Sequence, residues 1–576
     1  PGGHLKATLD PLGQRIDYRA DPLGRIVKKM LPQPGQPEGG QPWVEYFAYD
    51  PNGRLVATRN AHVEVTRAFD AEGQLLKETQ QHARGDCFVI ENAYDEAGNR
   101  VLRQTCFAGS GPQPAASAHR VEFAYDLLDQ HIETRLDGAE PIRHTRDALG
   151  QLTHEEFAPG LARELNYNAD GLLTGQRTWA GQQTLFATDY HYDAVGNLTR
   201  REDSGFGVDS YLYAPMGRIL AHTDPQGRIQ RFLNDPAGDR LVTHIAGSQV
   251  GKATVWQRSG EHEGTRYRFN RAGNLTHRQG ADGLLELEWD ANQRLIASHR
   301  RGADGQRLTT RYAYDPLGRR LWKETAGART AFGWDGDALA LDAAHGAARE
   351  FVYRPESFEP LVLLRGANSP ALHYINDPNG CPVRLIDSAG HIQWAARHQA
   401  WGGIAQLQVN QVDNPLRLQG QYEDGETGLH YNRYRYYAPQ IGAFISQDPL
   451  GLAAGVNVHD FAPNALGWVD PLGLSGKCGG GEAATGFVKD FATKNTKNWS
   501  AMFKSEGEAR ALARTRLGKN AVKVEPGKLR SADGVWQYRA KPGDVGENHI
   551  HLEQLNPKTG EVLQNLHLRW PKGAGR

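Results

Sequence analysis

Two aspartates begin a pentapeptide that occurs twice, as Asp448-Pro-Leu-Gly-Leu452 and as Asp470-Pro-Leu-Gly-Leu474, 22 residues apart. Two carboxylates that share a site do not both ionise easily, so one stays protonated as an acid while the other activates water. If folding brings the two copies to one site, Asp448 and Asp470 are the candidate pair. Asp460, between the two copies, is a weaker candidate for either place.

A structural turn is the competing interpretation of each copy. Asp before Pro and Gly is common turn chemistry, because Asp bonds to its own backbone and Gly accepts a positive φ. The same Asp-Pro-Leu-Gly run also begins at Asp10, Asp21 and Asp315, where only turns are expected.

A second group of polar residues lies on two segments near the C-terminus, 548–555 and 561–570. If both are strands, alternation places every second residue on one face. If residues 555 and 561 flank the intervening hairpin as partners, His549 faces His567 and His551 faces Asn565. The candidates on this face are His549, His551, His567 and Arg569, joined by Arg539 and Lys541 of the neighbouring segment 535–541.

Such a face suits metal-independent cleavage of RNA, without a cofactor. One histidine would remove the ribose 2′-OH proton, another would protonate the leaving oxygen, and Arg or Lys would stabilise the charged phosphorane. His-x-His with a third histidine could instead bind a metal ion in a metal-dependent nuclease. A deaminase is disfavoured, because no Cys-x-x-Cys follows His551-Leu552-Glu553. A metal-dependent DNase, an ADP-ribosyltransferase and a non-catalytic binding module remain alternatives.

The elements expected to carry these residues form a small α+β domain. Residues 486–518 are predicted to be largely helical, with a capping box at Ser505-Glu506-Gly507-Glu508 and a helix end at Gly518. Strands are expected at 521–525, 535–541, 548–555 and 561–570, in an antiparallel sheet.

The rest of the chain is dominated by a repeat, an aromatic residue followed by Asp-x-x-Gly and a polar–apolar pair. Tyr49-Asp50-Pro51-Asn52-Gly53-Arg54-Leu55 is a clear copy, and further copies begin at residues 69, 94, 192, 269, 289 and 314. The aromatic residue should end one strand, Asp-x-x-Gly should turn, and the apolar residue should begin the return strand. One such hairpin cannot bury its apolar face alone, so many must stack.

These copies resemble the YD repeats of the RHS family, over roughly residues 10–390. The resemblance implies a mainly β fold in which a YD-repeat shell, or cocoon, precedes a small α+β toxin domain. The expected domains are 1–390 for the shell, 391–474 for the RHS-associated core and 475–576 for the toxin. The segment from Gly420 to Leu474, which ends in Asp470-Pro-Leu-Gly-Leu474, resembles that core. The resemblance implies autoproteolysis by the aspartate pair between Leu474 and Ser475.

Charge divides the chain at the same point. Residues 475–576 hold 18 Lys and Arg against 10 Asp and Glu, whereas residues 1–474 hold 48 against 57. A basic tail on an acidic body suggests a polyanionic target for the tail. The four cysteines lack disulfide-framework or zinc spacing, and no apolar run is long enough to span a membrane. The start at Pro1 indicates a fragment or a processed product.

The sequence therefore resembles a secreted RHS effector used in competition between bacteria. Its tail would act on RNA in the cytoplasm of a recipient cell, and its layout resembles small ribonuclease toxins of the barnase, EndoU and colicin type. The resemblance implies a cognate immunity protein. It also implies a type VI secretion spike protein and a chaperone, both acting through a missing N-terminal region.

Overall fold

The fold was analysed in a computed structural model. It describes residues 4–474 except 36–39, 111–113, 236, 251–252 and 367–368, then residues 477–478 and the tail segments 488–489, 498–502, 522–525, 528–531, 536–539, 549–555 and 562–569. Two compact units divide the chain, Pro1–Gly480 and Gly481–Arg576. Among the described residues, no helix is long and apolar enough to cross a membrane.

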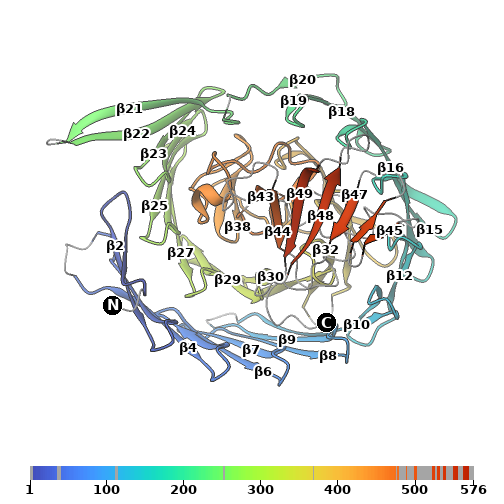
Figure 1. The fold of residues 1–576 in the computed structure, drawn as a ribbon, viewed down its shortest axis with the longest axis horizontal. Coiled ribbons are helices and arrows are strands. Elements are labelled where there is room, and N and C mark those ends of the chain that lie inside the picture. The colour runs from blue at the N-terminus through green and yellow to red at the C-terminus, as the bar shows by residue number, and fades with distance from the viewer. Residues whose placement is uncertain are drawn as a thin grey trace. The chain divides into compact units, whose positions relative to one another are not determined.

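The first unit is built almost entirely from antiparallel strands that pair in chain order. A 20-stranded sheet runs from β1 (Ala7–Leu9) to β20 (Ile229–Arg231), and a 16-stranded sheet runs from β21 (Val242–Val250) to β36 (Ile404–Asn410). The strands of the first sheet follow one another around a curved wall, and β25 (Gly283–Trp289) to β29 (Ala328–Asp335) pass alongside its early part (Figure 1). The predicted mainly β fold is confirmed.

The repeat residues have the roles that their types predict. Tyr49 ends β4 (Trp43–Tyr49), Gly53 has φ 86°, and Leu55 begins β5 (Leu55–Arg59). Asp50 closes the turn, because its Oδ1 accepts the Arg54 N–H at 2.8 Å while its Oδ2 accepts the Arg54 Nε–H at 2.6 Å. The hydroxyl of Tyr49 donates to the Ile26 carbonyl at 3.1 Å, which joins this repeat to the one before it.

Alternation along the strands also agrees with the prediction. In β25, Leu285, Leu287 and Trp289 are buried, whereas Glu286 and Glu288 are exposed.

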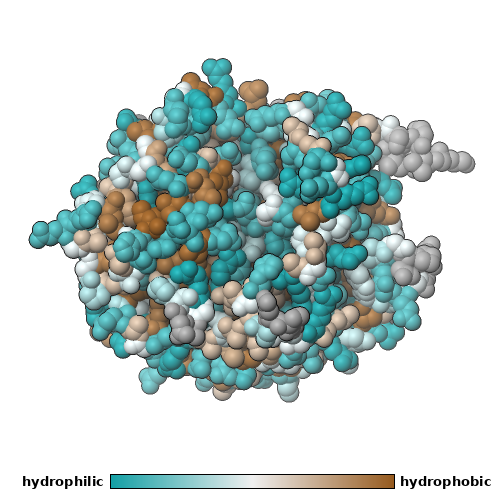
Figure 2. All heavy atoms as spheres, turned by 180° about the vertical axis from the view of Figure 1, so that it is seen from behind, coloured by the Kyte–Doolittle hydropathy of each residue, from teal (hydrophilic) through white to brown (hydrophobic). Residues whose placement is uncertain are grey.

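The turns of the first sheet that join an even-numbered strand to the next odd-numbered one all lie at the same edge, because neighbouring strands are antiparallel. Large apolar residues are exposed at the third turn position, among them Leu128, Leu149 and Met216. On the face that Figure 2 shows, apolar side chains gather in patches within a mostly hydrophilic surface.

The two large sheets are joined by buried ion pairs. Arg319 Nη1, in the turn before β28 (Arg320–Thr325), lies 2.8 Å from an oxygen of Glu78 in β7 (Leu75–His82), and both side chains are 1% exposed. Further pairs repeat this connection along the chain: Arg100 with Asp335, Arg354 with Glu155, Arg384 with Asp203, and Arg397 with Asp209.

Buried histidines make this unit sensitive to acid. Burial lowers the pKa of His373 and of His398 to about 4, below the usual value of about 6.5. Their contribution to stability is complete above pH 6.5 and is lost as pH falls toward 4, because unfolding then takes up protons. We expect the melting temperature to fall across this window, and to fall less steeply in a His373→Gln, His398→Gln double variant. An equally steep fall in the double variant would contradict this assignment.

The tail contains a seven-stranded sheet, whose strands are, in spatial order, β43 (Val488–Lys489), β44 (Asn498–Met502), β49 (Val562–Arg569), β48 (His549–Leu555), β47 (Trp536–Arg539), β46 (Lys528–Arg530) and β45 (Val522–Glu525). The expectation of helix across 486–518 is wrong at β43 and β44. Pairing decides the structure of β44, which lies parallel to β49 with Ser500 opposite His567. The predicted helix that begins at Ser505 lies outside the described residues.

Candidate functional site

A small sheet within residues 422–444 positions the candidate aspartate pair. Its strands are β37 (Tyr422–Asp424), β38 (Leu429–Asn432), β39 (Arg435–Ala438) and β40 (Ala443–Phe444). The β38–β39 hairpin turns at Arg433, which has φ 54°. Arg435 is the first residue of β39, and its side chain is 1% exposed. Both copies of the pentapeptide meet at this arginine.

Each aspartate of the pair first acts as a turn residue. Asp470 Oδ1 accepts the Leu474 N–H at 3.0 Å, which is the bond from the fourth following residue that closes the repeat turns. Asp448 Oδ1 accepts the Leu450 N–H at 2.8 Å, and its carbonyl accepts the Gly451 N–H at 2.8 Å. Both copies therefore form turns, and these turn bonds use Oδ1 of each carboxylate.

The second oxygens converge. Nη2 of Arg435 lies 2.8 Å from Asp448 Oδ2 and 3.3 Å from Asp470 Oδ2, and both carboxylates are almost fully buried. In several repeat turns this oxygen accepts from the side chain four residues later, as in Asp21 with Arg25 at 2.7 Å and Asp193 with Asn197 at 2.9 Å. The pentapeptides at 448 and 470 have leucine at that position, and their Oδ2 atoms contact Arg435.

Arg435 also holds the backbone next to the predicted cut. Its Nε donates to the Gly473 carbonyl, and its Nη1 donates to the Val458 carbonyl at 3.2 Å. Asn432 Nδ2 donates to the Asp470 carbonyl at 2.8 Å, and the Tyr434 N–H donates to the Leu472 carbonyl at 3.1 Å. The segment from Asp470 to Leu474 is thus bound along its length to the β38–β39 hairpin.

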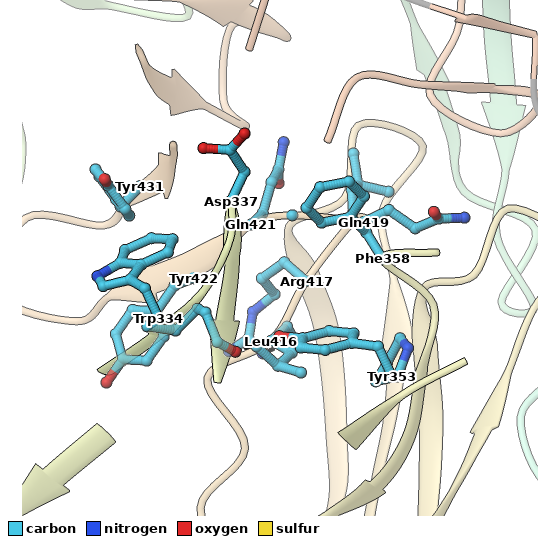
Figure 3. A pocket seen from close by; sticks show the side chains of 14 residues that line it. Trp334, Asp337, Tyr353, Phe358, Leu416, Arg417, Gln419, Gln421, Tyr422 and Tyr431 are labelled. Carbon is cyan, nitrogen blue, oxygen red and sulfur yellow. Dashed lines mark hydrogen bonds between the residues drawn. The ribbon is translucent and has the colours of Figure 1, made fainter. Parts of the chain in front are cut away.

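Close packing fixes this segment from two sides. Gly473 has φ 69°, and a Cβ there would lie 2.7 Å from the Asn432 carbonyl oxygen. A Cβ on Gly420 would overlap the Pro471 carbonyl. Gly420 belongs to the loop that forms one wall of a neighbouring pocket, in which Arg417 lies between Tyr422 and Tyr353 (Figure 3). Substitution of either glycine would therefore displace the predicted cleavage segment.

The electrostatics of the pair favour unequal protonation. Burial raises the pKa of Asp448, Arg435 opposes this shift, and the Asp470 carboxylate adds to it. Burial also lowers the pKa of Arg435 to about 10, which leaves it a cation at neutral pH. One cation beside two buried carboxylates stabilises a state in which one of them keeps a proton.

Asp460 is placed differently. Its backbone forms an isolated bridge with Ala443, and burial raises the pKa of its carboxyl to about 6, with Arg218 and Asp239 as the charges that act on it most. Among the described ion pairs, those of Arg435 are with Asp448 and Asp470. The arrangement favours Asp448 and Asp470 over Asp460.

The tail sheet brings most of the predicted histidine positions together, in a register that differs from the prediction. His551 lies opposite His567, and His549 lies opposite Arg569. The predicted pairs His549–His567 and His551–Asn565 are wrong by two residues, because Leu555 pairs with Val562 after a register shift at Gln554. Arg539 lies opposite His551 on the other side. Lys541 and Ser475 lie outside the described residues.

Sequence reasoning missed Arg435. It belongs to the Asn432-Arg433-Tyr434-Arg435 run, in which both arginines are buried and nothing in the sequence shows which one reaches the aspartates. A signal was present in the pentapeptides themselves. The three ordinary Asp-Pro-Leu-Gly copies are followed by a polar residue, Gln14, Arg25 or Arg319, whereas the two candidate copies are followed by leucine.

Comparison with known proteins identifies the scaffold. The teneurin YD-shell family model matches residues 117–452. Double-stranded DNA deaminase toxin A of Burkholderia cenocepacia is 30% identical, over 82% of this chain and 33% of that protein. Toxin protein Tse5 of Pseudomonas aeruginosa is 32% identical, over 75% of this chain and 37% of that protein. The chain thus spans about a third of the length of these relatives.

A further relative and a solved structure extend the comparison. The probable deoxyribonuclease RhsA of Dickeya dadantii is 28% identical over 73% of this chain and 30% of that protein. A crystal structure of TcdB2-TccC3-Cdc42 superposes with a TM-score of 0.59 at 17% identity, over 81% of this chain and 27% of that chain, which shows a shared fold. The family match covers more than half of the sequence, so the chain belongs to the teneurin YD-shell family, as a member with RHS/YD repeats.

Proposed function

We propose that the chain cuts its own backbone between Leu474 and Ser475. The observation that carries this proposal is the contact of Asp448 Oδ2 and Asp470 Oδ2 with the same Arg435 nitrogen, beside a backbone segment that ends at Leu474. Water attacks the Leu474 carbonyl carbon while one carboxylate takes its proton. The protonated partner gives its proton to the Ser475 nitrogen as the C–N bond breaks, which leaves a carboxyl on Leu474 and an amine on Ser475.

The proposed cut separates a container from its cargo. Residues 1–390 form the shell, residues 391–474 form the core that cleaves, and residues 475–576 are the released toxin. Relatives named as toxins support this division. The shell would enclose the toxin until a secretion spike and a chaperone deliver it to the cytoplasm of a recipient bacterium. An acidic immunity protein, which would cover the basic tail, would protect the producing cell.

The released domain is proposed to be a metal-independent ribonuclease. The row of positions Arg539, His551 and His567 across three neighbouring strands supports an acid, a base and a cation at one phosphate. Ser500, opposite His567 on β44, extends the row. A metal-dependent DNase is the second candidate, because two relatives are named as probable deoxyribonucleases.

We expect the self-cleaved protein to degrade RNA in the presence of EDTA. Replacing His551 or His567 by Ala should slow this by about 10² to 10⁴-fold, the usual contribution of general acid–base catalysis. RNA and DNA are incubated separately with the protein and followed on gels. His391→Ala, at a histidine of the first unit with a side chain 76% exposed, is the control with unchanged activity.

Each other outcome has a distinct meaning. DNA degradation that stops with EDTA would favour the DNase. RNA degradation that is unaffected by His551→Ala and His567→Ala would contradict the proposed acid–base roles. Binding of RNA or of a protein partner without any degradation would favour the non-catalytic module, and transfer of ADP-ribose from NAD would favour the transferase.

A further inference from the structure

A cavity of about 190 Å³ lies where three parts of the first unit meet. Its lining comes from β3 (Ile26–Leu31) of the first large sheet, from the turns before β26 (Leu295–Arg301) and β28 of the second, and from the β38–β39 hairpin. Pro449 also belongs to the lining. A water molecule takes about 30 Å³ in the liquid, so the cavity has room for a small molecule of several non-hydrogen atoms.

The charges that line this cavity are all positive. They belong to Lys29, Arg294 and Arg433, and none of the described residues in the lining is an aspartate or a glutamate. The carboxylates that pair with the three cations lie outside the lining: Glu45, Asp290 and Asp337. The cavity therefore presents cations and N–H groups to whatever fills it, and these favour a negatively charged ligand.

Two buried nitrogens in the lining have unused hydrogen-bonding capacity. Nε of Arg433 lies 2.7 Å from Asp337 Oδ1, but its Nη1 makes no hydrogen bond among the described residues. This Nη1 lies 3.5 Å from the place that a Cβ on Gly318 would take, and Gly318 also lines the cavity. Asn292 accepts from Lys29 Nζ through Oδ1, whereas its Nδ2 is buried without an acceptor in the described part of the chain. Buried donors without acceptors cost free energy, so acceptor atoms are expected in the cavity.

We propose that this cavity binds a phosphate group, either free in solution or carried by a small molecule. The donors come from three separate elements, through Lys29 on β3, Asn292 in a turn of the second sheet and Arg433 in the hairpin. A phosphate carries a charge of about −1.5 to −2 near pH 7 and offers three strong acceptor oxygens that point in different directions. A carboxylate has one charge and two oxygens in a single plane, so it matches this arrangement less well.

This inference goes beyond the proposed self-cleavage and does not depend on it. The atoms that carry it belong to Lys29, Asn292 and Arg433, whereas the cleavage is assigned to Asp448 and Asp470. A bound phosphate would connect the first sheet, the second sheet and the hairpin. It should therefore stabilise the folded first unit, because a ligand that binds only the folded state raises its melting temperature.

The first test is titration of the purified chain with inorganic phosphate, followed by calorimetry and by thermal melting. The buffer contains no other oxyanion, and chloride keeps the ionic strength constant. We expect saturable binding, half complete at about 1 mM phosphate or below, as suits a small ion held by several donors. The melting temperature should rise over the same concentrations. High concentrations of phosphate stabilise many proteins without binding at a site, so variants must show where it acts.

Asn292→Asp is the variant that tests the location. Aspartate keeps the size of the side chain and an oxygen for Lys29, but it replaces the unused N–H group by an anionic oxygen. Repulsion of like charges should weaken phosphate binding by at least about 10-fold. Asn52→Asp is the matched control, because Asn52 has the same third position in the turn that begins at Asp50, is exposed, and should bind like the parent.

Arg433→Lys tests the guanidinium. Lysine keeps the charge but lacks the second terminal nitrogen, so binding of phosphate should again weaken by about 10-fold. The melting temperature of each variant without phosphate shows whether the variant is folded. A folded Asn292→Asp chain that binds phosphate as tightly as the parent and the Asn52→Asp control would overturn the proposal.

A comparison of inorganic phosphate with glycerol 3-phosphate identifies the source of the group. Tighter binding of the ester, lost in Asn292→Asp, would assign the site to a phosphorylated small molecule that uses the rest of the cavity. Binding of inorganic phosphate that is equally tight or tighter would assign it to the free ion. If neither compound shows saturable binding, the cavity holds only water and the proposal fails.

Discussion

Asp448→Asn and Asp470→Asn are each expected to leave the chain as a single full-length band on a denaturing gel. Asn keeps the size of the side chain and can still accept the turn bond at Oδ1, made by Leu450 N–H and Leu474 N–H respectively. It cannot exchange a proton with water or with the leaving amine. The expected loss of rate is about 10² to 10⁴-fold.

Asp21→Asn is the matched control for this experiment. Asp21 begins the same Asp-Pro-Leu-Gly run, closes its turn in the same way, and pairs with Arg25 rather than with Arg435. Cleavage of the control should be unchanged. Full cutting after Leu474 in either test variant would remove that aspartate from the mechanism, and cutting abolished by Asp460→Asn alone would transfer its role to Asp460. Mass spectrometry of the C-terminal fragment confirms that it begins at Ser475.

Glu155→Gln is expected to cost the first unit about 3 to 5 kcal/mol of unfolding free energy. The Glu155 carboxylate lies 2.6 Å from Arg163, 2.8 Å from Arg354 and 3.0 Å from His144. Its side chain is fully buried, and these partners hold its pKa well below the usual range. The neutral amide would leave the buried Arg163 guanidinium without its counter-charge. It would also remove one of the two carboxylates paired with Arg354, the arginine that connects the two large sheets.

Denaturant unfolding of the cleaved shell measures this effect. Glu122→Gln is the control, since Glu122 pairs with Arg120 at 2.7 Å in a contact whose side chains are 39% and 50% exposed. Exposed pairs contribute about 0 to 1 kcal/mol, so the midpoint of the control should hardly move. Equal midpoints for Glu155→Gln and the parent would show that the buried pair contributes no net stability.

The repeat was predictable because its signals are local. Tyr49, Asp50 and Gly53 each act within a few residues, through strand ending, turn closure and positive φ. The burial pattern of Leu285, Leu287 and Trp289 follows from alternation alone. The prediction that Asp448 and Asp470 lie close together came from the resemblance to the RHS core. Their spacing in the sequence is equally compatible with two separate turns.

The remaining features depend on contacts between distant parts of the chain, which local sequence patterns do not reveal. Arg435 lies 13 residues before Asp448 and 35 before Asp470, so its contacts with both exist only after the chain has folded. The pairing of His551 with His567 depends on a register shift at Gln554, which alternation cannot reveal. Asn498–Met502 becomes a strand because β49 offers it a partner, a tertiary effect that overrides local preference.

Each repeat tyrosine donates a hydrogen bond from its hydroxyl to the preceding repeat, and these bonds limit how the curved wall of the first sheet can change in length. Tyr49 reaches the Ile26 carbonyl, Tyr94 the Leu75 carbonyl and Tyr192 the Leu173 carbonyl, always across one pair of strands. Inserting two strands with their turn restores every one of these bonds, whereas inserting one strand would move the following turns to the opposite edge and break the series. Gene duplication can therefore lengthen the wall only in steps of a whole hairpin, and the number of strands should vary among relatives in such discrete increments.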